Sequence, residues 1–200
     1  MSKEDTKTKL LDAAEQQVRQ KGADGFSYSD LSTIVGIRKA SIHYHFPTKA
    51  DLLSAVMARY SSQFEAELAR CAAQFPSAND QLIDFVALYR RALQDAGSLC
   101  LCVAFTVGRD SLSAATQAEI TRFRDAVQGW LQQRFEQLQS DNAPPWEIPP
   151  KAEAAATLAL VEGAQLAARS TADLNRYDAA TQGLLHRLGR VEQGPDRDEA

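Results

Sequence analysis

The sequence predicts an all-α protein in which a small three-helix N-terminal domain precedes a larger helical domain. Apolar residues recur at helical spacing along most of the 200 residues, and no segment alternates apolar and polar residues between hairpin turns. The 44% hydrophobic content is sufficient for a buried core at this length. We expect the first domain at residues 1–50, the second at 51–189 and a polar, disordered tail at 190–200.

The first three predicted helices lie close together in the chain. The first apolar run stops at Gly22, a residue typical of helix C-termini. Residues 27–30, Ser-Tyr-Ser-Asp, form a capping box that starts a second helix, which Gly36 ends. A short third helix follows at once and ends before Pro47, and a second capping box at 48–51 starts the fourth. Helix, tight turn and short helix form the helix-turn-helix pattern.

The rest of the chain also has helical periodicity. The segment SDNAPPWEIPPK, residues 140–151, contains four prolines and therefore predicts a loop. The longer periodic runs predict helices at about 49–73, 79–96, 99–108, 114–140, 151–170 and 174–188.

Charge is distributed unevenly along the chain. The net charge is −4, but residues 36–50 hold three cations and two histidines without a carboxylate. A local basic patch determines whether a surface attracts nucleic acid, so this segment indicates DNA binding by the third helix. The alternative is a short solvated helix whose charges have no partner. For DNA binding we expect base contacts from Arg38, Lys39, Ala40 and His43, and phosphate contacts from Ser27, Tyr28, Ser41, Tyr44, His45 and Lys49.

Residues 26–56, FSYSDLSTIVGIRKASIHYHFPTKADLLSAV, resemble the N-terminal domain of TetR/AcrR-family transcriptional repressors. The shared features are the phenylalanine before the second helix, Asp-Leu within it, Gly-Ile at the turn, Tyr-His-Phe closing the third helix and Lys-x-x-Leu-Leu opening the fourth. The resemblance covers about residues 8–56, and beyond them only the number and length of the helices are similar. Arg38 and Ala40 depart from the more usual Ser and Gly, and His43 departs from the more usual aromatic residue, so the family does not specify the operator sequence.

The last two predicted helices have the composition of a dimer interface. The segment 151–170 is rich in alanine and contains Gly163, and small side chains allow a second helix to approach closely. The resemblance implies that these helices pair with their copies in a four-helix bundle; the alternative is that both only cover the core of one chain. The expected interface residues are Leu158, Val161, Gln165, Leu184 and Leu188.

The middle helices carry the candidates for an inducer site. The resemblance implies a ligand cavity there, although aromatic residues on helices also form ordinary cores. The cavity residues we expect are Phe64, Phe85, Tyr89, Phe105, Phe123 and Trp130.

Cys100 and Cys102 are either buried apolar residues or sensors of an electrophile or oxidant. The resemblance extends to the branch of the family that senses electrophiles through a cysteine, and helix-start amides would favour a thiolate at Cys100. We rank Cys100 above Cys102, and Cys71 well below both. On one helix, residues two apart diverge by about 200° and do not easily form a disulfide.

These observations together predict a homodimeric repressor that binds double-stranded, palindromic operator DNA. A small apolar or electrophilic inducer would release it. One alternative is a DNA-binding activator or architectural protein without an inducer. An enzyme is a weaker alternative, because the sequence lacks known catalytic motifs, and His43 and His45 have the wrong spacing for a helical metal site. We therefore expect no cofactor and no metal.

The sequence also carries expectations about location. The N-terminal residues lack the apolar segment of a secretion signal, and no stretch reaches the roughly 18 apolar residues of a membrane span. We expect a cytoplasmic protein without a membrane partner, in which all three cysteines are thiols.

Overall fold

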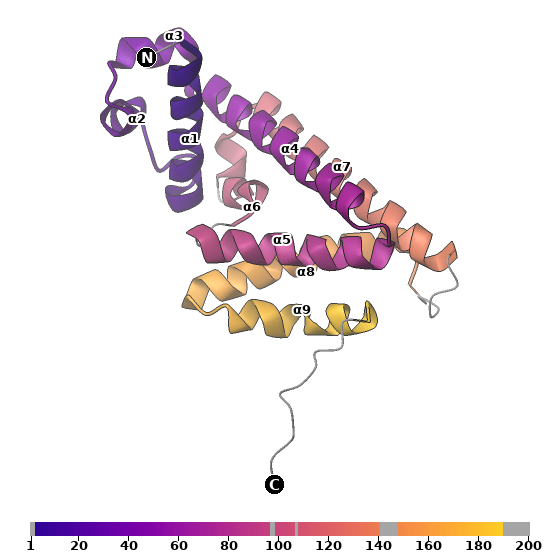
Figure 1. The fold of residues 1–200 in the computed structure, drawn as a ribbon. Helices are drawn as coiled ribbons and strands as arrows, with labels where there is room; N and C mark the ends of the chain where they lie inside the picture. The colour runs from indigo at the N-terminus through magenta and orange to yellow at the C-terminus, as the bar shows by residue number, and fades with distance from the viewer. Residues whose placement is uncertain (1–2, 97–98, 107, 141–147, 190–200) are drawn as a thin grey trace. The chain divides into compact units, whose positions relative to one another are not determined.

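The computed structural model describes residues 3–96, 99–106, 108–140 and 148–189, and in these residues every regular element is a helix (Figure 1). The all-α prediction is therefore confirmed. The expected tail and most of the proline-rich loop lie outside the described residues. The helices are α1 Lys3–Lys21, α2 Tyr28–Val35, α3 Lys39–His45, α4 Lys49–Gln74, α5 Ala78–Ala96, α6 Leu101–Thr106, the 3₁₀ turn η1 Arg109–Ser111, α7 Ala114–Ser140, α8 Pro150–Thr171 and α9 Asn175–Arg187.

The chain folds into two compact units. The first comprises Met1–Leu68 and Ser98–Val127, and the second comprises Ala69–Gly97 and Gln128–Ala200. The first compact unit therefore continues past residue 50, where the sequence suggested a domain boundary. The reason is that α4 starts with fully buried residues, among them Leu52, which continue the core of the first unit.

Two capping boxes begin the helices on either side of α3. The Ser27 hydroxyl oxygen accepts from the amides of Ser29 and Asp30 at 3.2 and 3.4 Å, while the Asp30 carboxylate accepts from the Ser27 amide at 2.7 Å. Thr48 and Asp51 repeat this reciprocal pattern at the start of α4. Gly36 ends α2 with φ of 73°, a left-handed conformation that glycine adopts without steric cost. Local sequence thus determines where these helices start and stop.

The core of the first unit holds α3 in place. α1 packs on α2 and α6, and α2 packs on α3. Leu10, Leu31 and Ile42, from α1, α2 and α3, are each 0% exposed. A fully buried residue of this size contributes roughly 1.5–3 kcal/mol, so these contacts outweigh the low intrinsic stability of a seven-residue helix.

In the second unit, α8 packs on both α5 and α9, and α5 also packs on α9. Buried polar groups tie these helices together. The Tyr177 hydroxyl donates to the Val86 carbonyl at 2.8 Å, and the Gln165 side-chain amide donates to the Tyr89 carbonyl at 2.8 Å. Each bond satisfies a group that would be costly to bury alone.

Candidate nucleic-acid interface and thiol pair

The helix α3 presents a polar face to solvent. Its buried residue is Ile42, and the C-cap residue Phe46 is also buried, so these two side chains fix the helix on the domain. All four expected base-contacting residues are exposed: Arg38, which is the N-cap, and Lys39, Ala40 and His43. The face opposite Ile42 is therefore available to a partner, as the sequence predicted.

His43 has a defined orientation. Its Nδ1 lies 3.1 Å from the Pro47 carbonyl oxygen, and its ring lies edge-on to Tyr28 with centroids 4.9 Å apart. A carbonyl oxygen only accepts, so Nδ1 must carry the proton in this bond. In neutral His43, Nε2 is then a hydrogen-bond acceptor.

The six expected phosphate-contacting residues fall into two groups. Tyr44 is 67% exposed, and Ser41 and His45 are half-buried on α3. Ser27, Tyr28 and Lys49 instead make contacts within the domain. The Ser27 hydroxyl donates to Asp30 at 2.7 Å as part of the capping box.

Tyr28 and Lys49 bridge neighbouring segments. The Tyr28 hydroxyl donates to the Phe46 carbonyl at 2.9 Å, which ties α2 to the end of α3. Burial, and secondarily Asp51, raise the pKa of Tyr28 to about 12. The Lys49 ammonium donates to the Phe26 carbonyl and lies 4.3 Å from the centre of the Phe26 ring. Burial lowers the pKa of Lys49, while Asp24 and Asp30 oppose that shift.

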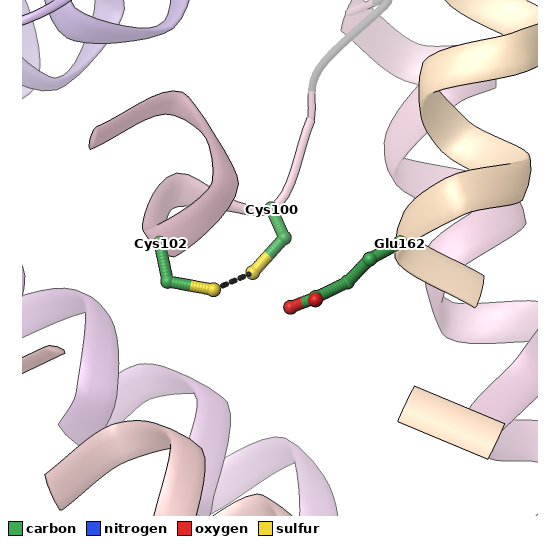
Figure 2. Close-up of side chains that lie close together, drawn as sticks. All are labelled: Cys100, Cys102 and Glu162. Atoms are coloured by element: carbon green, nitrogen blue, oxygen red, sulfur yellow. Dashed lines mark hydrogen bonds between the residues drawn. The ribbon is translucent and has the colours of Figure 1, made fainter. Parts of the chain in front are cut away.

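Cys100 and Cys102 form a close pair. Their sulfur atoms point at one another and lie 3.0 Å apart (Figure 2). The expectation that they diverge is wrong, because Cys100 precedes α6 and is not part of it. Its carbonyl accepts from the amides of Val103 and Ala104, so its position is that of a cap. The helical angle between residues two apart therefore does not apply.

Side chains from three other helices surround the two sulfur atoms. The Tyr60 hydroxyl of α4 donates to Cys100 Sγ at 3.4 Å, and Arg124 Nη1 of α7 donates to Cys102 Sγ at 3.5 Å. Burial, followed by the neighbouring Cys100, raises the pKa of Tyr60 well above its usual value, so the hydroxyl remains a donor. The Arg19 guanidinium of α1 lies 5.3 Å from the centre of the Tyr60 ring. No local pattern in the sequence connects these three residues to the cysteines, so only the fold brings them together.

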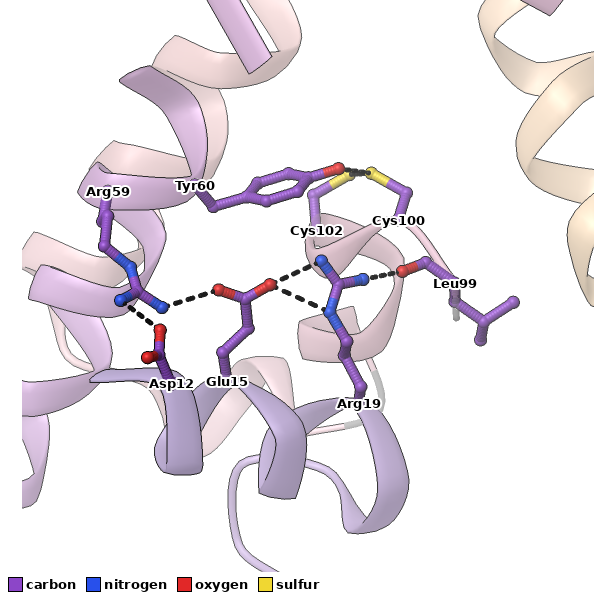
Figure 3. Close-up of polar contacts among 8 residues, drawn as sticks. All are labelled: Asp12, Glu15, Arg19, Arg59, Tyr60, Leu99, Cys100 and Cys102. Atoms are coloured by element: carbon purple, nitrogen blue, oxygen red, sulfur yellow. Dashed lines mark hydrogen bonds and ion pairs between the residues drawn. The ribbon is translucent and has the colours of Figure 1, made fainter. Parts of the chain in front are cut away.

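A network of ion pairs extends from this pair to α1 and α4 (Figure 3). Arg19 donates to the carbonyl of Leu99, the residue before Cys100, and to Glu15 at 2.7 Å. Arg59 of α4 donates to the same Glu15 at 3.0 Å and to Asp12 at 2.7 Å. The backbone beside Cys100 is thus connected to both long helices of the first unit.

Cys71 has a different environment in the second unit. It is buried, and its sulfur donates to the Gln81 carbonyl at 3.6 Å. Burial first, and then a hydrogen bond with Asp84, raise the pKa of this thiol to about 12. A thiol that stays protonated is a poor nucleophile, which agrees with its low rank as a sensor.

Residues 10–56 match the family described as bacterial regulatory proteins, tetR family. The HTH-type transcriptional regulator CymR of Pseudomonas putida is 32% identical over 132 residues, which are 64% of this chain and 64% of that protein. A TetR-family regulator from Agrobacterium tumefaciens has a similar structure, with a TM-score of 0.89, 27% identity and coverage of 93% of this chain and 98% of that one. Residues 10–56 thus resemble the N-terminal domain of the TetR family, and the chain as a whole is similar to TetR-family regulators. A TetR regulator from Legionella pneumophila is also similar, with a TM-score of 0.77, 28% identity and coverage of 91% and 94%.

The aromatic residues expected around an inducer fall into separate clusters in the structure. In the first unit, Phe64 and Phe123 lie with their ring centres 5.2 Å apart, and Tyr60 contacts both. Phe105 is fully buried in the same unit. In the second unit, Phe85 contacts Tyr89 and Trp130, with ring centres 5.1 and 5.9 Å apart. The rings pack against one another as they do in an ordinary hydrophobic core, which was the alternative interpretation. The inducer cavity stays a prediction.

The expected dimer residues are buried inside the single chain itself. All five are at most 3% exposed in the single chain, so a partner helix cannot reach them. These apolar residues lie on the inward faces of α8 and α9, because apolar residues mark whichever surface is buried first. Dimerisation through the two helices stays a prediction. The five are Leu158, Val161, Gln165, Leu184 and Leu188. Among the described residues, no helix is long and apolar enough to cross a lipid bilayer.

Proposed function

We propose that this TetR-family protein is a homodimeric transcriptional repressor that reads palindromic operator DNA with α3 and dissociates when an inducer acts on it. The observation that carries the proposal is the exposed, carboxylate-free face of α3, fixed from behind by Ile42. Such a face favours DNA over other partners. It carries hydrogen-bond donors for base edges, and it has no negative charge that would repel the phosphates. Two copies would place their α3 helices about 34–36 Å apart, in successive major grooves.

The roles of individual residues follow from their chemistry. Lys39 is suited to guanine O6 and N7, and Arg38 can donate to the same edge. Ala40 allows close approach to a thymine methyl. His43 Nε2, an acceptor in the neutral ring, is suited to adenine N6 or cytosine N4. Ser41, Tyr44 and His45 would donate to phosphates, and these positions set affinity rather than sequence preference.

Dimerisation through α8 and α9 would use their outer faces. Gly163 and Gly183 have open space where a Cβ would lie, and Leu166 is 48% exposed. Small residues beside an exposed leucine suit close packing against a second helix. Replacement of Leu166 with Arg should therefore yield monomers in light scattering without loss of helix content, whereas Gln63→Arg, at an exposed position of α4 outside these two helices, serves as a control.

An electrophile or oxidant acting at Cys100 or Cys102 is the favoured inducer class. Both sulfur atoms lie in the unit that carries α3, and the network through Arg19 and Arg59 connects them to α1 and α4. Only three residues separate the end of α3 from the start of α4, so a movement of α4 would reposition the reading helix. The inducer shifts the equilibrium only by its differential affinity for the two conformations.

The test is fluorescence-polarisation binding to DNA from upstream of the protein's own gene. The wild type should bind this DNA and release it on treatment with N-ethylmaleimide or peroxide. The variant Lys39→Ala should bind weakly and with relaxed sequence preference. Binding that is insensitive to these reagents would favour a regulator with a non-covalent inducer or none. Failure of the untreated protein to bind any fragment in a random-sequence selection would refute DNA reading by α3.

A further inference from the structure

We infer that Cys100 and Cys102 are a dithiol oxidation site, at which a hydroperoxide forms a disulfide between them and thereby releases DNA. The part of this inference that concerns DNA rests on the proposed function, whereas the disulfide chemistry does not. It differs from single-cysteine sensing because both sulfur atoms take part and no adduct remains on the protein.

The distance between the sulfur atoms supports bond formation. They lie 3.0 Å apart, and a disulfide needs about 2.05 Å, so closure requires a shift of about 1 Å shared by two side chains. Cys100 is outside α6, and its side chain can rotate without breaking helical hydrogen bonds. Oxidation therefore needs no unfolding of the helix.

The neighbouring donors assign different roles to the two thiols. The positive charge of Arg124 beside Cys102 Sγ favours the thiolate at that sulfur, which makes Cys102 the attacking group. Tyr60 donates a neutral hydrogen bond to Cys100. Cys100 is then the second thiol, which resolves the first oxidation product. This reverses the order that the sequence suggested for the two residues.

The reaction balances with a hydroperoxide as the only oxidant. The Cys102 thiolate attacks the terminal peroxide oxygen; the O–O bond breaks, and an alcohol or water leaves after taking a proton. The resulting sulfenic acid at Cys102 is attacked by Cys100, the S–O bond breaks, and the Cys100 proton leaves with the hydroxide as water. Two thiols are oxidised by two electrons in total, and the peroxide is reduced by two.

The same contacts connect the disulfide to the DNA-binding unit. Movement of Cys100 toward Cys102 weakens the hydrogen bond from Tyr60 of α4, because a disulfide sulfur is a poorer acceptor than a thiol or thiolate. It also displaces Leu99, whose carbonyl accepts from Arg19 of α1. Arg19 shares Glu15 with Arg59 of α4, so both α1 and α4 experience the change, and α4 follows α3 directly in the chain.

The chemical test uses the purified full-length protein and hydrogen peroxide. After alkylation of the remaining thiols, intact mass and peptide mapping should show one Cys100–Cys102 disulfide in the wild type, reversible by dithiothreitol. Cys71→Ser is the matched control and should form the same bond. Cys100→Ser should stop at a sulfenic or sulfinic acid on Cys102. Wild-type protein that gains oxygen atoms without forming the bond would overturn the inference.

A second measurement tests the role of Arg124 separately from folding. Arg124→Gln should slow the reaction at neutral pH, because Cys102 loses the positive charge that favours its thiolate. The rate should recover as the pH rises, because the thiol is then deprotonated without that charge. Arg122→Gln, two residues away on the same helix with a 69% exposed side chain, is the control and should react like the wild type. Equal rates and pH profiles for both variants would overturn the assignment of Cys102 as the attacking sulfur.

DNA binding is then measured on the same samples. Peroxide should release DNA from the wild type and Cys71→Ser, and leave Cys100→Ser bound at matched peroxide exposure. A disulfide that forms without any change in affinity would overturn its role in release. If the reduced protein binds no DNA while the disulfide still forms, the proposed function fails and the oxidation site remains established by mass.

Discussion

Replacement of Tyr28 with Phe tests whether this tyrosine positions the reading helix or contacts phosphate. The hydroxyl donates to the Phe46 carbonyl at 2.9 Å, and Phe46 is buried, so the variant leaves that acceptor without its partner. The expected loss is about 1–3 kcal/mol of unfolding free energy. Each kcal/mol should lower Tm by about 2–4 °C in a protein of this size. Differential scanning calorimetry measures this shift directly.

The matched control is Tyr44→Phe on the exposed face of α3. Tyr44 is 67% exposed, so loss of its hydroxyl should change stability by less than about 0.5 kcal/mol, while weakening binding to all DNA sequences. The reasoning would be refuted if the two variants had the same Tm.

Alkaline titration gives an independent check on Tyr28. Burial raises the pKa of Tyr28 in the folded state from its usual value of 10.0 to about 12, so the fold favours the protonated phenol. This contribution is fully present below pH 10 and is lost as the pH rises from about 10 toward 12. The unfolding free energy of the wild type should fall more steeply across that window than that of Tyr28→Phe, and parallel curves would contradict the assigned environment.

Three further predictions concern the reading helix, its cap and the second unit. Lys39→Ala should reduce discrimination between the operator and single-base variants by about 1–3 kcal/mol, measured by competition binding at fixed salt; an unchanged ratio would remove Lys39 from base reading. Ser27→Ala should cost about 1 kcal/mol in urea unfolding, because α2 loses its cap, whereas Thr33→Ala in the same helix is a control that lacks a capping role. Cys71 should resist iodoacetamide at pH 8.5 in native protein and react once the protein is unfolded, as its raised pKa requires; rapid native labelling would contradict the burial.

Sequence patterns were sufficient to predict the helices and most of their boundaries, although α6, expected at about 99–108, spans only Leu101–Thr106. The capping boxes at Ser27 and Thr48 are local, because each donor and acceptor lies within three residues of the other. The left-handed Gly36 is local as well. Helical periodicity over long runs predicted α4 and α7 to within one residue at each end, since a buried stripe must repeat every three to four residues.

Periodicity could not tell which partner buries each apolar face. Leu158 and Leu184 mark a buried surface in α8 and α9, but only tertiary structure shows that the same chain provides the cover. Tyr28 and Lys49 were plausible phosphate contacts from residue type alone. Their actual acceptors, the carbonyls of Phe46 and Phe26, are 18 and 23 residues away in the chain.

The sequence by itself determined the all-α fold, the position of α3 and the residues on its exposed face, because helix periodicity, capping and charge act within a few residues. Tertiary structure alone decided the chemistry around the cysteines. The contact between Cys100 and Cys102 depends on where α6 begins, and Tyr60 and Arg124 approach it from α4 and α7. Packing sets these distances across tens of residues, and no local spacing rule encodes them.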